Sequence, residues 1–379
     1  IAVPNNDGVH SGPNEQIQYS EYGDWVFPSG TVIVKHFDLR IDDNDPSITK
    51  KIETRISVVD ENGNMYYLTY NWNDDETDAV LQTTSIEEPV EIATVGGGTR
   101  IQDWFFPSNS NCIDCHNEAN KGSLGLKSRY LNTDYTYPET GLTGNQLVTL
   151  SHLGIIDESI TDSDTEDIIT NKPLNDTNAT LDEKARSYLD LNCAYCHRHD
   201  NDNRAEFDLR YFNTLEATEL LTSGILSPLG IAADEKILYP GNASKSILYH
   251  RMNSVDPAIM MPPLAKSIID EPAVALIEEW IYQLDENSAN GPNNPNPIIN
   301  LALLPSAELS GYVDSGSGRG TPLDILFDPS INDYKTTSSY AEYGVPYQNN
   351  LGTVDAENGF YWQVDWTNPK VINYITFGG

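Results

Sequence analysis

The sequence predicts a multidomain α+β protein, with a β-rich N-terminal domain, α-helical domains in the middle, and a C-terminal fragment of a jelly-roll-like β-sandwich. Residues 1–110 contain short runs in which β-branched and aromatic residues alternate with polar ones. Residues 111–287 carry apolar residues at helical spacing. Alternation returns in residues 301–379 after a Pro- and Asn-rich stretch. A chain of 379 residues is long enough for two or three domains with their own cores.

The N-terminal domain is predicted to contain three strands, at residues 32–37, 52–59 and 65–72. The last two are separated by Asp-Glu-Asn-Gly-Asn at residues 60–64, which is typical of a hairpin turn with Gly63 at the position that needs a positive φ. We expect the three glycines at residues 96–98 to end this domain.

The first helical region, residues 111–175, is predicted to contain a helix over residues 144–154. The acidic stretch 161–167 follows this helix and has the composition of a linker.

The second helical region, residues 176–287, is predicted to form a compact domain. Residues 181–191 are amphipathic and lead directly into a cysteine motif. A closing helix over residues 271–284 is predicted from its apolar stripe, with Asp270 as N-cap and Pro272 in the first turn.

Residues 288–300 form a Pro/Asn linker that has no capacity to build a core. The β-like region that follows, residues 301–379, alternates most clearly at 361–366 and 371–377. Because this pattern is still running at the last residue, we expect the C-terminal domain to be incomplete.

The charge of the chain is strongly negative, with 22 Lys and Arg against 57 Asp and Glu and a formal net charge of −35. Such a surface repels nucleic acid and anionic lipid, so we expect no nucleic-acid partner. No apolar run reaches the roughly 18 residues that a transmembrane helix needs. The sequence begins Ile-Ala-Val-Pro, unlike a translation start, and we expect an export signal to lie outside it.

All four cysteines lie in two Cys-x-x-Cys-His pentads, at residues 112–116 and 193–197. This spacing is typical of c-type haem attachment, in which both thiols form thioethers with the haem and the adjacent His binds the iron. A pair of redox disulfides or a Cys/His zinc site is the alternative, but neither requires a His directly after each pair. The pentads therefore predict two covalently bound haems, attached at Cys112, Cys115, Cys193 and Cys196.

For the second haem, His197 is predicted as the proximal iron ligand and Met261 as the distal one. Met261 stands in a Met-Pro-Pro loop downstream of the pentad, the place where a small cytochrome c carries its thioether ligand. Met260 is the alternative ligand, and a Met that only packs in the core is the other reading. His199 is too near the pentad to reach the far face of the porphyrin, and His250 is interpreted as structural or near a propionate.

For the first haem, His116 is the proximal ligand, and no Met-Pro-Pro loop follows it. His152, on the predicted helix after the pentad, is favoured as the distal ligand, with His36 as the alternative. Two His ligands would give this haem a lower potential than the His/Met haem. An open, five-coordinate iron that reacts with peroxide is the competing hypothesis.

Residues 24–284 resemble the di-haem cytochrome module of exported bacterial proteins, including the cytochrome regions of sorbosone/glucose-dehydrogenase-like proteins. The resemblance is carried, in order, by residues 25–37, 52–55, 70–79, 112–116, 124–132, 145–147, 187–198 and 261–266. It implies α-helical cytochrome c haem domains and electron transfer, with a quinoprotein dehydrogenase as a candidate redox partner. No catalytic domain of that kind is present in this sequence.

Residues 361–375 are similar to the early strands of discoidin-like (type C) jelly rolls, which commonly bind glycans or surfaces. A purely structural β-sandwich is the alternative for this segment.

Three functions follow from these motifs. The favoured one is an exported electron carrier, periplasmic or on the surface of a bacterium, with no catalytic residues. The second is a di-haem peroxidase or oxidoreductase that works at an open first haem. The third is a surface-binding or assembly protein whose haems conduct electrons.

Overall fold

The computed structural model describes residues 1–199, 201, 206–284, 307–313 and 360–366. The chain divides into two compact units, Ile1–Pro295 and Asn296–Gly379. A β-rich N-terminal region is followed by helices, as the predicted α+β class requires. The expected linker at residues 288–300 lies outside the described residues.

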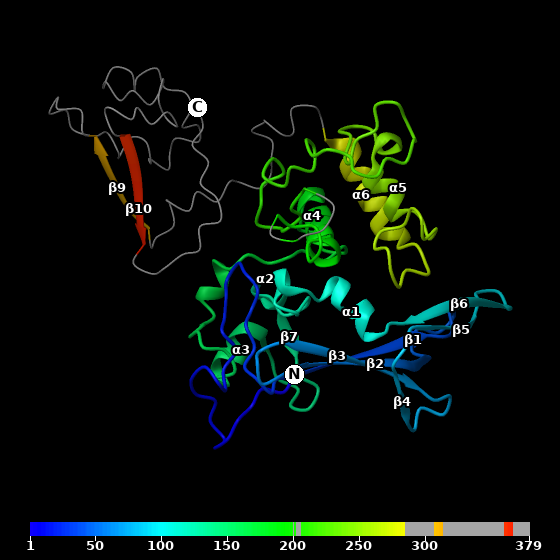
Figure 1. Cartoon of the computed structure of the whole chain (residues 1–379), viewed down its shortest axis with the longest axis horizontal. Helices are drawn as coiled ribbons and strands as arrows, with labels where there is room; N and C mark the ends of the chain where they lie inside the picture. Colours follow the sequence, from blue (N-terminus) through cyan, green and yellow to red (C-terminus); the bar gives the residue numbers. More distant parts are fainter. Residues whose placement is uncertain (200, 202–205, 285–306, 314–359, 367–379) are drawn as a thin grey trace. The chain divides into compact units, whose positions relative to one another are not determined.

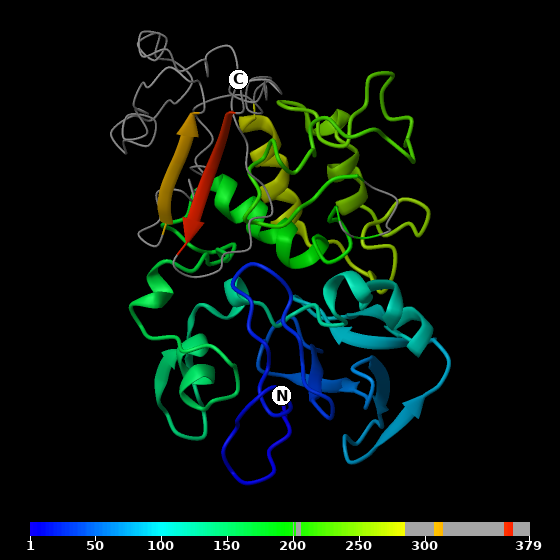
Figure 2. The same cartoon turned by 60° about the vertical axis from the view of Figure 1, so that its left-hand side comes forward.

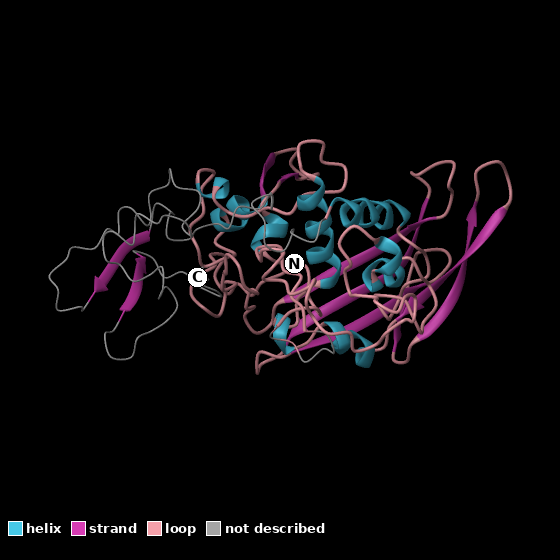
Figure 3. Ribbon diagram, turned by 90° about the horizontal axis from the view of Figure 1, so that it is seen from above, coloured by secondary structure: helices cyan, strands magenta, loops and turns pink. Residues whose placement is uncertain are grey.

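The N-terminal region is built on a four-stranded antiparallel sheet whose strands follow each other in sequence order. Its strands are among those drawn in magenta in Figure 3. These strands are β1 (Val32–Arg40), β2 (Thr49–Val59), β3 (Met65–Trp72) and β4 (Ala79–Gln82). The first three confirm the predicted strands. The turn between β2 and β3 has Gly63 at φ 83°, and the Asp60 carboxylate accepts the backbone N–H groups of Asn62 and Asn64 at 2.8 and 2.9 Å.

A separate hairpin pairs β5 (Ile86–Ala93) with β6 (Thr99–Phe106). Gly96, Gly97 and Gly98 have φ values of 88°, 89° and 116° and form its turn. The prediction that these glycines end the β-rich region was therefore wrong. Consecutive positive φ values reverse the chain at little steric cost, and the second strand continues to Phe106.

Short elements follow the hairpin. They are α1 (Asn109–Cys115), η1 (Glu118–Asn120), α2 (Ser128–Leu131), β7 (Asp134–Thr136), β8 (Thr143–Asn145), α3 (Gln146–His152) and η2 (Asp164–Glu166). The helix α3 lies inside the predicted range 144–154, and it begins where the Asn145 side chain accepts the N–H of Leu147 at 2.9 Å.

This segment shares a core with the β-rich region. The buried members of that core come from the N-terminal arm, the end of β2, and the stretch from α3 onward: Ile17, Trp25, Phe27, Val59, Leu147, Ile156 and Ile160. The boundary expected at residue 110 thus does not separate two cores.

Three further helices and a 3₁₀ turn complete the described part of the first unit: α4 (Leu181–Cys193), η3 (Ala243–Lys245), α5 (Ile247–Met252) and α6 (Glu271–Gln283). A capping box begins α4, in which the Thr180 hydroxyl accepts the Glu183 N–H at 3.2 Å and the Glu183 carboxylate accepts the Thr180 N–H at 2.7 Å. The Asp270 carboxylate caps α6 by accepting the Ala273 N–H at 3.2 Å, which confirms the predicted start.

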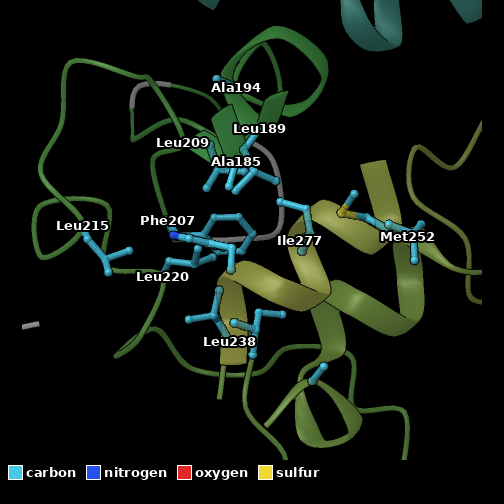
Figure 4. Close-up of a cluster of buried hydrophobic side chains, with 14 residues drawn as sticks. Ala185, Leu189, Ala194, Phe207, Leu209, Leu215, Leu220, Leu238, Met252 and Ile277 are labelled. Atoms are coloured by element: carbon cyan, nitrogen blue, oxygen red, sulfur yellow. The ribbon is translucent and has the colours of Figure 1, made fainter. Parts of the chain in front are cut away.

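The helices pack around a second hydrophobic core. Side chains from α4, α6 and the loop between α4 and α5 point toward one another in Figure 4. Ile277, Trp280 and Ile281 form the buried stripe of α6 that the sequence predicts. Figures 1 and 2 show α1 between the β1–β4 sheet on one side and α4 on the other.

In the C-terminal unit, β9 (Ala307–Val313) pairs antiparallel with β10 (Phe360–Trp366). β10 coincides with the predicted strand at 361–366, whereas the one at 371–377 lies outside the described residues. Among the described helices, none is long and apolar enough to span a bilayer.

Candidate functional site

The first pentad lies at the end of α1, against the β1–β4 sheet. The Asn111 side chain accepts the Ser108 N–H at 3.1 Å and so fixes the start of the helix. Cys112 and Cys115 are one helical turn apart, and the Cys112 thiol lies against the Thr69 side chain on β3. Both thiols are half-buried and free.

The imidazole of His116 is held in one orientation by a backbone carbonyl. Its Nδ1 lies 2.8 Å from the Gly122 carbonyl oxygen. Because a carbonyl only accepts, Nδ1 carries the proton and Nε2 has its lone pair available for a metal. Burial holds the pKa of His116 below its ordinary value, and the cations Arg55 and Lys35 add to this effect. The ring is therefore in the neutral form that binds iron.

Tyr67 and Gly122 complete this first site, and neither residue was predicted from the sequence. The Tyr67 ring centroid is 4.7 Å from that of His116, and its hydroxyl donates to the Gly122 carbonyl at 3.0 Å. Gly122 has φ 76°, and a Cβ built there would lie 2.9 Å from both the Met65 Sδ and the Tyr67 hydroxyl. The sequence feature that could have pointed to Gly122 is its position six residues after His116.

The second pentad lies in the turn that ends α4. The backbone N–H groups of Cys196 and His197 donate to the Cys193 carbonyl at 3.1 and 2.8 Å. The His197 ring stacks on Phe207, with centroids 4.5 Å apart and planes 8° from parallel. Burial lowers the pKa of His197 to about 4, with a smaller effect from Arg251.

The His197 Nδ1 is buried and has no hydrogen-bond partner within the described part of the chain. Burial also raises the pKa of the Cys193 thiol to about 12. The pentad thus presents a neutral imidazole and a protonated thiol from the end of one helix.

The predicted Met loop lies beside this second pentad. The Met261 N–H donates to the Arg251 carbonyl at 3.0 Å, and the Lys266 ammonium donates to the Met261 carbonyl at 3.2 Å. Arg251 acts electrostatically on His197, and Lys266 acts on Cys193, so both residues link the loop to the pentad. Met260 is buried and Met261 is half-buried.

His36 is not brought to the first pentad. Pairing places Arg55 opposite both Lys35 and Thr69, so these three side chains share the sheet face that the pentad contacts. His36 is the next residue along β1 and points to the other face, where its Nδ1 lies 2.7 Å from the Thr54 hydroxyl.

His152 is likewise not brought there. It is exposed at the C-terminal end of α3, a helix that packs against β8 and α2. Figure 1 shows α3 apart from α1. Neither sequence-predicted distal ligand of the first haem therefore lies next to His116.

Two further histidines, His199 and His250, have local partners. His250 Nε2 lies 3.0 Å from the Ser244 carbonyl, and exposed His199 lies 3.8 Å from Asp208 and 3.6 Å from Glu219.

The segments that carry the two pentads are tied together by buried charges. The Asp24 carboxylate pairs with Lys127 and, at 2.7 Å, with Arg198, the residue after His197. Arg129 makes a bidentate pair with Asp190 on α4, at 2.6 and 2.8 Å. The pKa of Asp24 is below its ordinary value, because the pull of Lys127 and Arg198 outweighs the opposing effect of burial.

The donor set fits c-type haem: two neutral imidazoles, each preceded by a thiol pair at the right spacing. Within the described residues, no three His, Cys, Asp or Glu side chains form a metal-ion cluster. A haem iron takes only one or two ligands from the protein, so haem attachment at the pentads does not require such a cluster. Comparison with family models, curated proteins and solved structures gave no match to this chain.

Proposed function

We propose that this protein is an exported di-haem c-type cytochrome that transfers electrons between a redox partner and an acceptor. The observation that supports this most directly is the state of His116. Its Nδ1 is tied to a backbone carbonyl, and the imidazole is kept neutral by burial at the end of the Cys-x-x-Cys turn. These features prepare Nε2 to bind iron.

In this proposal, Cys112 and Cys115 attach the first haem, and Cys193 and Cys196 attach the second. His116 and His197 are the proximal ligands, and Met261 is the distal ligand of the second haem. Each bound haem supplies a one-electron redox couple whose potential depends on its axial ligands. The protein holds both imidazoles neutral and oriented, and it limits contact with water by burying them.

The acidity of the chain supports a basic redox partner, because opposite charges steer association. The resemblance to exported cytochrome modules favours a periplasmic or cell-surface location in a bacterium and a quinoprotein dehydrogenase as electron donor. Glycan or surface binding by the C-terminal unit remains a proposal that rests on the discoidin-like segment.

The test is to produce the full chain behind an export signal in a bacterium that attaches c-type haem, and to count haems by the pyridine haemochrome spectrum and intact mass. We expect two haems in the wild type, one in C112S/C115S and one in C193S/C196S. A haem-free wild type with four titratable thiols, or one that retains zinc instead, would refute the proposal.

A second candidate function is a peroxidase or oxidoreductase with an open first haem. The positions of His36 and His152 favour it, because neither lies beside the first pentad. Carbon monoxide binding by the reduced protein is the test: one haem binding the gas readily, together with a high-spin ferric signal, supports this candidate. Two low-spin haems that exclude the gas support the pure electron carrier.

A further inference from the structure

The two pentads are distant in the sequence but contact each other in the structure. The thiols of Cys115 and Cys196 lie against each other. Each is the second cysteine of its pentad. The two haem-attachment sites therefore meet at equivalent positions.

Three asparagines join the backbones of the pentads, and we call Asn117, Asn120 and Asn201 the asparagine bridge. The Asn120 amide donates to the Cys115 carbonyl at 2.6 Å and to the Tyr195 carbonyl at 3.3 Å, so one side chain spans both pentads. The Asn201 amide donates to the carbonyls of Tyr195 and Cys196 at 3.3 and 3.1 Å.

Asn117 connects the other two members of the bridge. The side-chain oxygen of Asn117 accepts a hydrogen bond from the Asn120 side-chain amide at 3.3 Å. The side-chain amide of Asn117 donates to the side-chain oxygen of Asn201 at 3.4 Å.

Asn120 is the central member. It is fully buried, and its Oδ1 has no hydrogen-bond partner in the part of the chain that the structure describes. A buried acceptor without a partner is costly, so this side chain is present for what its NH₂ group does. An aspartate would remove that donor and set a charge against two carbonyl oxygens.

We propose that the asparagine bridge, with Asn120 at its centre, positions Cys115 and Cys196 in contact so that the two haems form one electronically coupled pair. This inference rests on the proposed haem attachment. Thioether bonds at Cys115 and Cys196 would tie each sulfur atom to its own porphyrin. The sulfur contact would then set the edges of the two haems side by side, and an electron could pass directly between them.

Circular dichroism of the holoprotein in the Soret region tests the proposal, because two neighbouring haems give a bisignate couplet. We expect a couplet in the wild type and loss of most of its amplitude in Asn120→Ala, with two haems per chain in both. Asn201→Ala, at a partly exposed position, should lose amplitude in the same way, and it decides the matter if Asn120→Ala fails to fold.

Asn132→Ala is the matched control. Asn132 is also buried, and its amide donates to the carbonyls of Thr165 and Ile168 at 2.9 and 2.7 Å, away from the pentads. This variant should be destabilised and yet keep the full couplet, so a purely structural effect is separated from positioning.

Two results would overturn the inference: a wild type with two haems and no couplet, or a full couplet in both Asn120→Ala and Asn201→Ala. A wild type without haem is a different outcome, because it refutes the proposed function before the coupling is measured.

Discussion

The carbonyl of Gly122 accepts hydrogen bonds from both the His116 ring and the Tyr67 hydroxyl, so the orientation of a candidate iron ligand depends on one glycine. Glycine is required there for two reasons. Its φ of 76° lies in the left-handed region, and a Cβ would come within 2.9 Å of the Met65 sulfur. A side chain at this position would therefore move the carbonyl away from His116.

Gly122→Ala should lower the free energy of unfolding by about 1–3 kcal/mol, the usual range for a residue forced into a sparsely populated backbone conformation. It should also perturb the optical and electron paramagnetic resonance signals of the first haem and leave those of the second unchanged. Urea unfolding and the two spectra measure these effects.

Gly125→Ala is the control for this change. A Cβ added at Gly125 would meet no heavy atom within 4 Å, and the residue does not have a positive φ, so an alanine fits there. Equal effects of the two substitutions on the first haem would count against the role of the Gly122 carbonyl.

At the scale of elements, the pleat of the sheet decides which side chains can reach the first pentad. Tyr67 and Thr69 on β3 lie on the face of the sheet that the first pentad contacts, together with Arg55 on β2. His36 is on the opposite face because successive residues of a strand alternate sides. His36 could therefore serve this haem only if the register of β1 shifted by one residue.

His36→Ala and His152→Ala should therefore leave the spin state and the reduction potential of the first haem unchanged. His116→Ala should abolish its normal spectrum, because it removes the proximal ligand. Potentiometric titration with optical detection makes the comparison. A large fall in the population of low-spin haem in either His36→Ala or His152→Ala would show that the variant had lost a real iron ligand.

Several of the elements were predictable from local patterns. Alternation identified β1, β2 and β3, and the stripe of α6 with its Asp270 cap identified the closing helix. The Gly96–Gly98 run was misjudged, because glycines that end a domain and glycines that turn a hairpin have the same local composition. Only the pairing of Ile92 with Arg100 across the turn distinguishes them.

At the scale of the whole first unit, the contacts that matter most join residues that are distant in the sequence. The pentads and the histidine at the end of each were recognised from spacing alone. The Cys115–Cys196 contact, the asparagine bridge and the role of the Gly122 carbonyl were not recognised, because they depend on tertiary packing that no local pattern encodes. The sequence also could not show that His36 and His152 lie away from His116, because their positions depend on the same tertiary packing.

Among these contacts between distant residues, the ion pairs of Asp24 are the ones whose removal should have the clearest effect on stability. The Asp24 carboxylate belongs to the N-terminal arm, Lys127 follows the first pentad, and Arg198 directly follows the second. The side chains are 8%, 4% and 5% exposed, so the pairs are shielded from water. Asp24→Asn removes the charge shared by the two cations and should destabilise the protein by about 3–5 kcal/mol at pH 7.

The effect should depend on pH in a definite direction. Because the pKa of Asp24 in the folded protein is below its ordinary value of 3.8, its contribution to stability is complete above that pH. The contribution is lost as the pH falls through the lower, folded-state pKa. The difference in unfolding free energy between wild type and Asp24→Asn should thus shrink in acid, as measured by urea unfolding from pH 7 to pH 3. Asp74→Asn, at an exposed pair with Lys50, should show no measurable change, and a pH-independent deficit in Asp24→Asn would contradict this account.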